Sequence, residues 1–126
     1  MSLKQQLRQL RPKFAAAAQA IYDSWEQDED GFDEEFGGGG ICDAIANAIM
    51  GLMPSGIDTM DGGQPGDEHA FVIAFNDTEA CTVDIPPGVY ESGGGYNWKK
   101  RQGVTITEDD VEIIPINRSD IEPEDY

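Results

Sequence analysis

Apolar residues recur at helical spacing in two segments of the first half of the chain. The first segment, residues 12–26, contains a run of alanines and begins with a proline, which suits the first turn of a helix. The second segment, residues 41–53, follows four consecutive glycines. We therefore expect two helices, each packing through an apolar stripe. The stripes consist of Phe14, Ala17, Ile21 and Trp25 in the first helix and of Cys42, Ile45, Ala46, Ile49 and Met53 in the second.

The pattern changes to alternation, the period of β-strands, in the second half of the chain. Residues 69–75 and 80–85 alternate in this way, and the Asn-Asp pair in residues 76–79 favours a hairpin turn between them. A further strand is expected at residues 111–116, whereas residues 55–68 are rich in Gly, Asp and Pro and are expected to form a loop. The patterns together predict an α+β fold, with N-terminal helices packed on a small antiparallel β-sheet.

Length and composition limit the classes of function. A chain of 126 residues suffices for a single domain, and we expect residues 1–11 and 118–126 to be frayed ends. The net charge of -17 argues against nucleic-acid binding and leaves a basic protein as a suitable partner. The sequence shows neither an apolar run long enough to span a membrane nor a signal peptide, so we expect no membrane association and a cytoplasmic location.

The acidic residues 27–36 invite comparison with a calcium-binding loop. If Gly31 were the sixth position of an EF-hand loop, the twelfth would be Gly37, where a bidentate Glu is required. We interpret the segment as a solvated loop. The sequence therefore predicts no metal and no cofactor.

Cys42 stands in the first turn of the second predicted helix, directly after the glycines. Backbone N–H groups without acceptors and the positive end of the helix dipole favour a thiolate at such a position. The glycines leave room for a substrate carbonyl, and Gly40 and Ile41 are candidates for an oxyanion or substrate site beside the N–H of Cys42. Cys42 is therefore a candidate nucleophile.

His69 is the only histidine of the chain, which makes it the candidate general base near neutral pH. In a hairpin with a tight turn at Asn76 and Asp77, the position numbers of directly opposed residues add up to 153. This register places His69 opposite Asp84, with their Cβ atoms about 5 Å apart. Asp84 is then the residue that orients the imidazole, as in a catalytic triad.

Strand alternation also predicts which face of the hairpin is buried. We expect the odd-numbered residues of the strand 69–75, including His69, to pack on the helix that carries Cys42. Cys81 points away from Asp84 in the next strand. We expect it to be a small buried side chain that forms no disulfide with Cys42 and takes no part in catalysis.

Each of the three residues also has a structural interpretation. A cysteine on an apolar helix stripe commonly packs in the core, and a lone histidine at the start of a strand is commonly structural. Asp84 precedes Ile85 and Pro86, where a polar residue often ends a strand. The coincidence of the three features favours catalysis.

The order of these motifs resembles that of papain-like cysteine hydrolases, among them transglutaminase-like and NlpC/P60-like proteins. Gly-Gly-Ile-Cys-Asp opens a helix, His-Ala-Phe-Val opens a strand, and Val-Asp-Ile-Pro-Pro lies in the next strand. The resemblance covers residues 39–90. It implies Cys42 as nucleophile, His69 as general base and then acid, Asp84 as the orienting residue, and acyl transfer through a thioester.

Two classes of function remain open from the sequence. The first is a cysteine hydrolase or acyltransferase acting on an amide or peptide bond, with Tyr90 and Trp98 as candidates for walls of the substrate groove. The second is a non-catalytic acidic binding or inhibitor module that engages a basic partner, and this class includes a hydrolase relative that has lost its activity.

Overall fold

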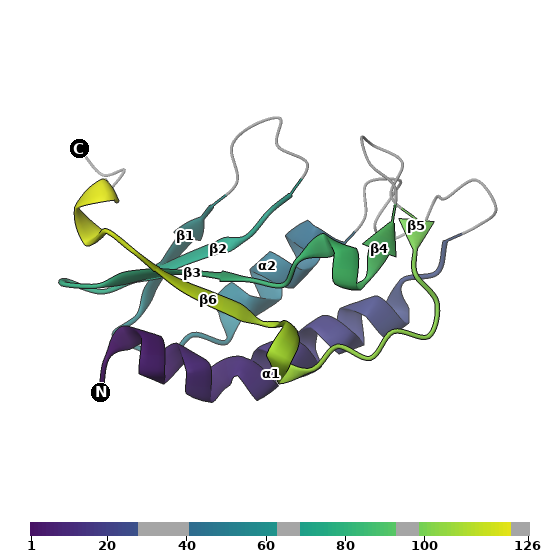
Figure 1. Cartoon of the computed structure of the whole chain (residues 1–126), viewed down its shortest axis with the longest axis horizontal. Coiled ribbons are helices and arrows are strands. Elements are labelled where there is room, and N and C mark those ends of the chain that lie inside the picture. Colours follow the sequence, from purple (N-terminus) through teal and green to yellow (C-terminus); the bar gives the residue numbers. More distant parts are fainter. Residues whose placement is uncertain (28–40, 63–68, 93–98, 122–126) are drawn as a thin grey trace.

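Two helices and a four-stranded antiparallel sheet make up most of the described part of the chain, residues 1–27, 41–62, 69–92 and 99–121 of the computed structural model (Figure 1). The sheet has the strand order β1-β2-β3-β6, and β4 and β5 pair in a separate ribbon. This confirms the predicted α+β class. The elements are α1 (Leu3–Ser24), α2 (Cys42–Gly51), β1 (Asp58–Asp61), β2 (Val72–Phe75), β3 (Ala80–Asp84), β4 (Glu91–Ser92), β5 (Lys99–Lys100) and β6 (Glu112–Ile116).

Helix α1 begins well before the predicted start, so the expectation of a frayed end at residues 1–11 was wrong. Ser2 and Gln5 form a capping box in which each side chain accepts a hydrogen bond from the other residue's backbone N–H, at 3.1 and 2.9 Å. Leu3 and Leu7 are fully buried. They extend the apolar stripe toward the N-terminus, but polar and basic residues between them conceal the spacing.

Pro12 lies inside α1 and not in its first turn. A proline has no backbone N–H, so the carbonyl of Arg8, four residues earlier, loses its usual donor. The Nε atom of Arg11 donates to this carbonyl at 3.4 Å. The side chain of Arg11 therefore supplies a donor in place of the backbone N–H that the proline lacks.

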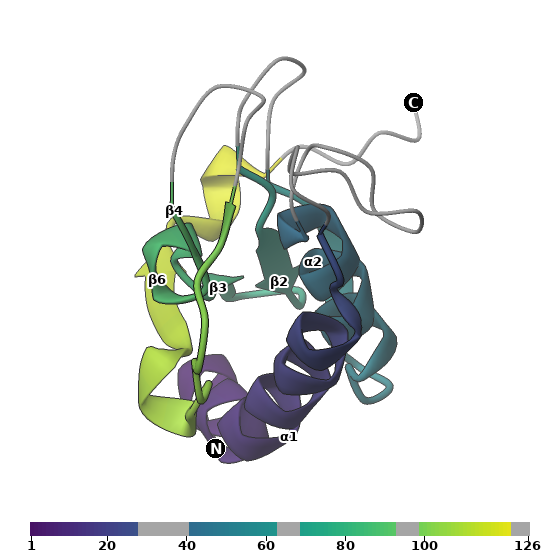
Figure 2. The same cartoon turned by 90° about the vertical axis from the view of Figure 1, so that its right-hand side faces the viewer.

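Helices α1 and α2 cover one face of the sheet (Figure 2). The side chains buried on this face are those of Val72 and Ala74 in β2 and of Cys81 and Val83 in β3. The prediction that the odd-numbered face of the strand 69–75 packs on α2 was therefore wrong. Small even-numbered side chains allow the helices to approach the sheet closely, whereas bulky Phe75 remains partly exposed beside the guanidinium of Arg118, 5.1 Å from its ring centroid.

Two further segments depart from the predicted boundaries. The segment 55–68, expected to be a loop, contains β1, which pairs antiparallel with β2. The end expected to fray at residue 118 instead forms a 3₁₀ turn, Arg118–Asp120, followed by the buried side chain of Ile121. Arg118 donates Nε to the carbonyl of Asn76 at 2.6 Å and so ties this turn to the β2–β3 hairpin.

The segment between β5 and β6 is held to α1 by the side chains of Tyr22 and Gln19. The hydroxyl of Tyr22 donates to the carbonyl of Arg101 and accepts from the N–H of Val104. The Oε1 atom of Gln19 accepts from the N–H of Ile106 at 2.6 Å, and its Nε2 atom donates to the carbonyl of Val104 at 3.3 Å. Ile106 is itself buried in the common core. The first helix therefore packs against residues from the last quarter of the chain.

Most of the buried apolar side chains of the described residues form one cluster between the helices and the sheet. No helix in this part of the chain combines the length and the apolar character required to cross a bilayer.

The molecule has two distinct ends along the sheet (Figure 1). The start of α2, the end of β3 and the β4–β5 ribbon lie at one end, on the right in Figure 1. The N-terminus, the β2–β3 turn and the 3₁₀ turn after β6 lie at the other. The candidate catalytic residues belong to the first of these ends.

Candidate active site

His69 and Asp84 are in direct contact. The Nε2 atom of His69 lies 2.6 Å from Oδ1 of Asp84, and each side chain is about a quarter exposed, at 25% and 26%. His69 stands three residues before β2, and Asp84 is the last residue of β3. The structure therefore brings together the imidazole and the carboxylate that the sequence paired.

The register behind this pair differs from the prediction. Val72 is opposite Val83 and Phe75 is opposite Ala80, so opposed position numbers add up to 155 and not to 153. The N–H of Asn76 donates to the carbonyl of Glu79 at 3.0 Å, which moves the tight turn one residue along the chain. His69 and Asp84 are not directly opposed. A shift of two positions leaves side chains on the same face, so the two still meet diagonally.

Cys42 approaches the same imidazole from α2. Its side chain is partly exposed and lies close enough to His69 to contribute to the raised pKa of the imidazole. The Nε2 atom of His69 is engaged by Asp84, whereas Nδ1 is a buried atom with no hydrogen-bond partner among the described residues. The imidazole therefore lies between a carboxylate and a thiol, which is the order of groups in a Cys-His-Asp triad.

Electrostatics at His69 favour the charged ring. The hydrogen bond with Asp84, followed by the interaction with Cys42, raises the pKa of His69 from 6.5 to about 9, although partial burial opposes this rise. His69 is therefore an imidazolium at neutral pH. It can donate a proton to a leaving group and can stabilise negative charge on a neighbouring sulfur.

The orientation of the His69 ring has a second support, Phe71. The two rings are stacked, with centroids 6.2 Å apart and planes inclined by 28°. Phe71 lies over Gly62, whose N–H donates to the carbonyl of Phe71 at 2.9 Å. A Cβ atom at position 62 would overlap the ring of Phe71. Glycine at this position thus leaves the space in which Phe71 supports the imidazole.

Two buried polar side chains from the segment after β3 interact electrostatically with the groups of the site. Tyr90 is fully buried and Glu91 is 3% exposed. Burial raises the pKa of Glu91 to about 7, and the charge of His69 opposes this rise. Burial also raises the pKa of Tyr90, with further contributions from Glu91, Cys42 and Asp84. Both side chains therefore lie within electrostatic reach of the triad.

The other predicted site residues have different positions. Gly40 and Trp98 fall outside the described residues. Ile41 is at the N-cap of α2 with a buried side chain, so only its backbone faces the region of Cys42. Tyr90 lies within the core and does not form an exposed wall. Cys81 is a buried free thiol whose pKa is raised by burial, as expected for a packing residue.

Glu91, Phe71 and Gly62 were not identified from the sequence. Glu91 follows Tyr90 in a short segment with no clear period, where a glutamate would ordinarily face solvent. Phe71 and Gly62 act through a contact between positions that are nine residues apart in the chain. The alternation of the strand 69–75 does place Phe71 on the same face as His69, and this was the one available signal.

Within the described ranges, no group of three or more His, Cys, Asp and Glu side chains is arranged to hold a metal ion. No protein-family model matches the chain, and neither does any curated protein or solved structure. The function of the site is therefore argued from its geometry alone.

Proposed function

We propose that this protein is a cysteine hydrolase or acyltransferase of papain-like type that acts on an amide or peptide bond. The observation that supports this proposal best is the position of His69, in contact with Asp84 at 2.6 Å and within electrostatic reach of Cys42. Cys42 provides the nucleophile, His69 transfers protons, and Asp84 orients the imidazole.

The reaction proceeds in two acyl-transfer steps. The sulfur of Cys42 attacks the amide carbon and forms a C–S bond, while protonated His69 donates its proton to the departing nitrogen as the C–N bond breaks. The N-terminus of α2 provides backbone N–H groups for the oxyanion. Neutral His69 then removes a proton from water or an acceptor amine, which attacks the thioester. The new bond replaces the C–S bond, and Cys42 recovers the negative charge.

The competing function is a non-catalytic acidic module that binds a basic protein. The net charge of -17 favours this alternative, because opposite charges steer such partners together. The two proposals differ in what they require of Cys42. A salt-sensitive complex with a basic protein that persists in Cys42→Ala would support the binding module.

The test of the catalytic proposal is the alkylation of Cys42 by iodoacetamide at pH 7, followed by peptide mass analysis. Free cysteine in solution serves as the reference for an unactivated thiol, and Cys81, which is buried, should stay unmodified while the protein is folded. We expect Cys42 to react faster than free cysteine, and His69→Asn to slow the reaction roughly tenfold or more, because the imidazolium no longer supports the thiolate.

The matched control is Glu112→Gln, which removes an exposed charge from the residue opposite Asp84 on β6 and should leave the rate unchanged. The pH dependence of alkylation in the unmodified protein provides a measurement that does not depend on variant folding. A Cys42 rate equal to that of free cysteine across the range from pH 5 to 9 would refute the proposal.

A further inference from the structure

Helices α1 and α2 cover one face of the four-stranded sheet, and strand alternation turns the remaining side chains to the other face, which we call the open face (Figure 2). The register aligns four of these side chains in one row across β1, β2, β3 and β6, namely Met60, Ile73, Thr82 and Ile114. Met60, Ile73 and Thr82 are partly exposed, and Ile114 is 53% exposed. Three of the four members of the row are therefore large apolar side chains that reach solvent.

The apolar surface continues on both sides of this row. On one side, Phe75 is opposite Ala80, which is itself opposite Ile116, and both Phe75 and Ile116 are partly exposed. On the other side, Phe71 is partly exposed and precedes Ile73 by two positions, so it has the same strand parity. Single exposed apolar side chains are ordinary, whereas neighbouring ones on one face commonly mark an interaction site.

The charges carried by the four strands have one sign. The strands contain acidic residues but no lysine or arginine. Of the eight lysines and arginines of the chain, four lie in α1 and three at residues 99–101. The eighth, Arg118, lies over the ring of Phe75 and donates to the carbonyl of Asn76. A partner that combines apolar surface with positive charge is therefore complementary to the open face.

We propose that the open face is a docking surface for a polypeptide segment that carries both apolar and basic side chains. The apolar side chains of the segment pack on the row from Met60 to Ile114, and its basic side chains are attracted by the carboxylates of the strands. A second copy of this chain fits the surface poorly, because two molecules that each carry a net charge of -17 repel each other. An anionic lipid surface is repelled for the same reason.

The open face leads to the candidate active site. The ring of Phe71 stacks on that of His69, with centroids 6.2 Å apart, and Ile73 follows on the same face. A segment docked on the row therefore lies near the imidazole. The delivery of this segment to Cys42 as a substrate rests on the proposed function, whereas the docking itself does not.

The test measures the binding of a short, fluorescently labelled peptide of alternating leucine and lysine by fluorescence anisotropy. We expect Ile114→Gln to weaken binding roughly fivefold or more, because it removes apolar contact without changing the charge. Leu52→Gln is the matched control and should leave the affinity unchanged, since Leu52 is 37% exposed but ends the helix that covers the opposite face. Added salt should weaken binding, and a peptide of alternating leucine and glutamate should not bind.

Methyl signals in the NMR spectrum of the unmodified protein provide a second measurement that needs no variant. Those of Met60, Ile73 and Ile114 should shift when the leucine-lysine peptide is added, whereas those of Leu52 should not. No binding of this peptide, equal binding of the leucine-glutamate peptide, or equal affinities of Ile114→Gln and Leu52→Gln would overturn the inference. A dimer of the unmodified protein that Ile114→Gln dissociates would overturn it in favour of a second copy.

The docking proposal and the proposed function can fail separately. Binding with the expected loss in Ile114→Gln, in a protein whose Cys42 alkylates no faster than free cysteine, would support the docking surface and contradict the proposed function. Rapid alkylation of Cys42 in a protein that does not bind the leucine-lysine peptide would do the reverse.

Discussion

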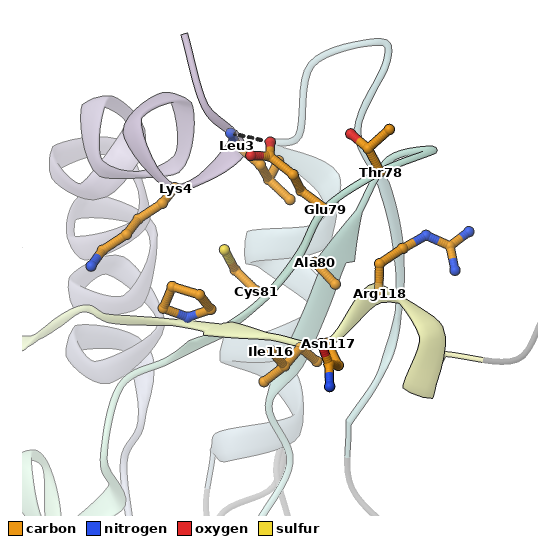
Figure 3. Close-up of a pocket in the computed structure, with 10 residues that line it drawn as sticks. Leu3, Lys4, Thr78, Glu79, Ala80, Cys81, Ile116, Asn117 and Arg118 are labelled. Carbon is orange, nitrogen blue, oxygen red and sulfur yellow. Dashed lines mark hydrogen bonds between the residues drawn. The ribbon is translucent and has the colours of Figure 1, made fainter.

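The two cysteines of this protein lie at opposite ends of one sheet and have contrasting surroundings. Cys42 is partly exposed beside His69, whereas Cys81 is buried and lines an open hollow of about 250 Å³ near the N-terminus (Figure 3). Glu79 and Arg118 also line this hollow, and both make hydrogen bonds to backbone groups. The unpaired buried polar atoms of the described residues all belong to the other end.

This difference separates two properties that are often treated as one, namely empty volume and the presence of reactive polar groups. The hollow near Cys81 lies where the start of α1 packs against the start of β3. Glu79 accepts there from the N–H of Leu3 at 2.7 Å and complements the positive end of the α1 dipole. The end with Cys42 carries two groups with raised pKa values, Glu91 at about 7 and His69 at about 9. Chemistry is therefore indicated by polar groups that the fold leaves incompletely paired, and not by empty volume.

Replacing Asp84 should have the largest effect on this comparison. In Asp84→Asn we expect the pKa of His69 to fall from about 9 toward its ordinary value of 6.5. Because the folded protein binds this proton more tightly, its contribution to stability is fully present below pH 6.5 and is lost as pH rises through 9. The difference in free energy of unfolding between the two proteins should be on the order of 2 kcal/mol at pH 6, allowing for partial exposure of the pair.

Urea unfolding at pH 6 and pH 9.5 provides this measurement. The difference between Asp84→Asn and the unmodified protein should shrink toward zero at the higher pH. A difference that stays constant across the range would mean that His69 does not hold its proton through Asp84.

Replacing Glu79 should destabilise the end of the molecule that contains Cys81 and leave the end with Cys42 unchanged. In Glu79→Ala the buried N–H of Leu3 loses its acceptor, and we expect the free energy of unfolding to fall by about 1–2 kcal/mol in a urea titration. The alkylation rate of Cys42 should remain unchanged. A slower reaction of Cys42 would show that the two ends are coupled and would invalidate the comparison between them.

Adding one carbon at Gly62 should produce the smallest effect. In Gly62→Ala the new Cβ displaces the ring of Phe71 and disturbs its stack on His69. We expect the alkylation of Cys42 to slow by about threefold, a modest consequence of local overpacking. Gly51→Ala is the matched control, because a Cβ there meets no other atom within 4 Å. Equal rates in the two variants would exclude a supporting role for Phe71.

The sequence predicted the elements better than their boundaries. Alternation and helical period identified α2, β2, β3 and β6, because each carries enough apolar residues to show a period. Strand β1 was missed because it is four residues long and lies among Gly and Asp. The start of α1 was missed because only Leu3 and Leu7 mark its stripe among polar residues.

The site could be predicted where it depends only on which face of a strand each side chain occupies. The pairing of His69 with Asp84 survived a register error of two positions, because an even shift does not move a side chain to the other face. Glu91 could not have been predicted in the same way. Its burial depends on a 3₁₀ turn and on its cross-strand partner Lys100, which donates to the carbonyl of Trp25 instead, and neither feature has a period along the chain.

The contact of Gln19 with Val104 and Ile106 has a consequence for the order in which the protein can be built. During synthesis α1 emerges first, yet the residues that Gln19 binds emerge more than 80 positions later. Contacts of such sequence separation form late and slow folding. The part of α1 around Gln19 must therefore wait for its partners until most of the chain has left the ribosome, whereas α2, which also packs on α1, emerges much earlier.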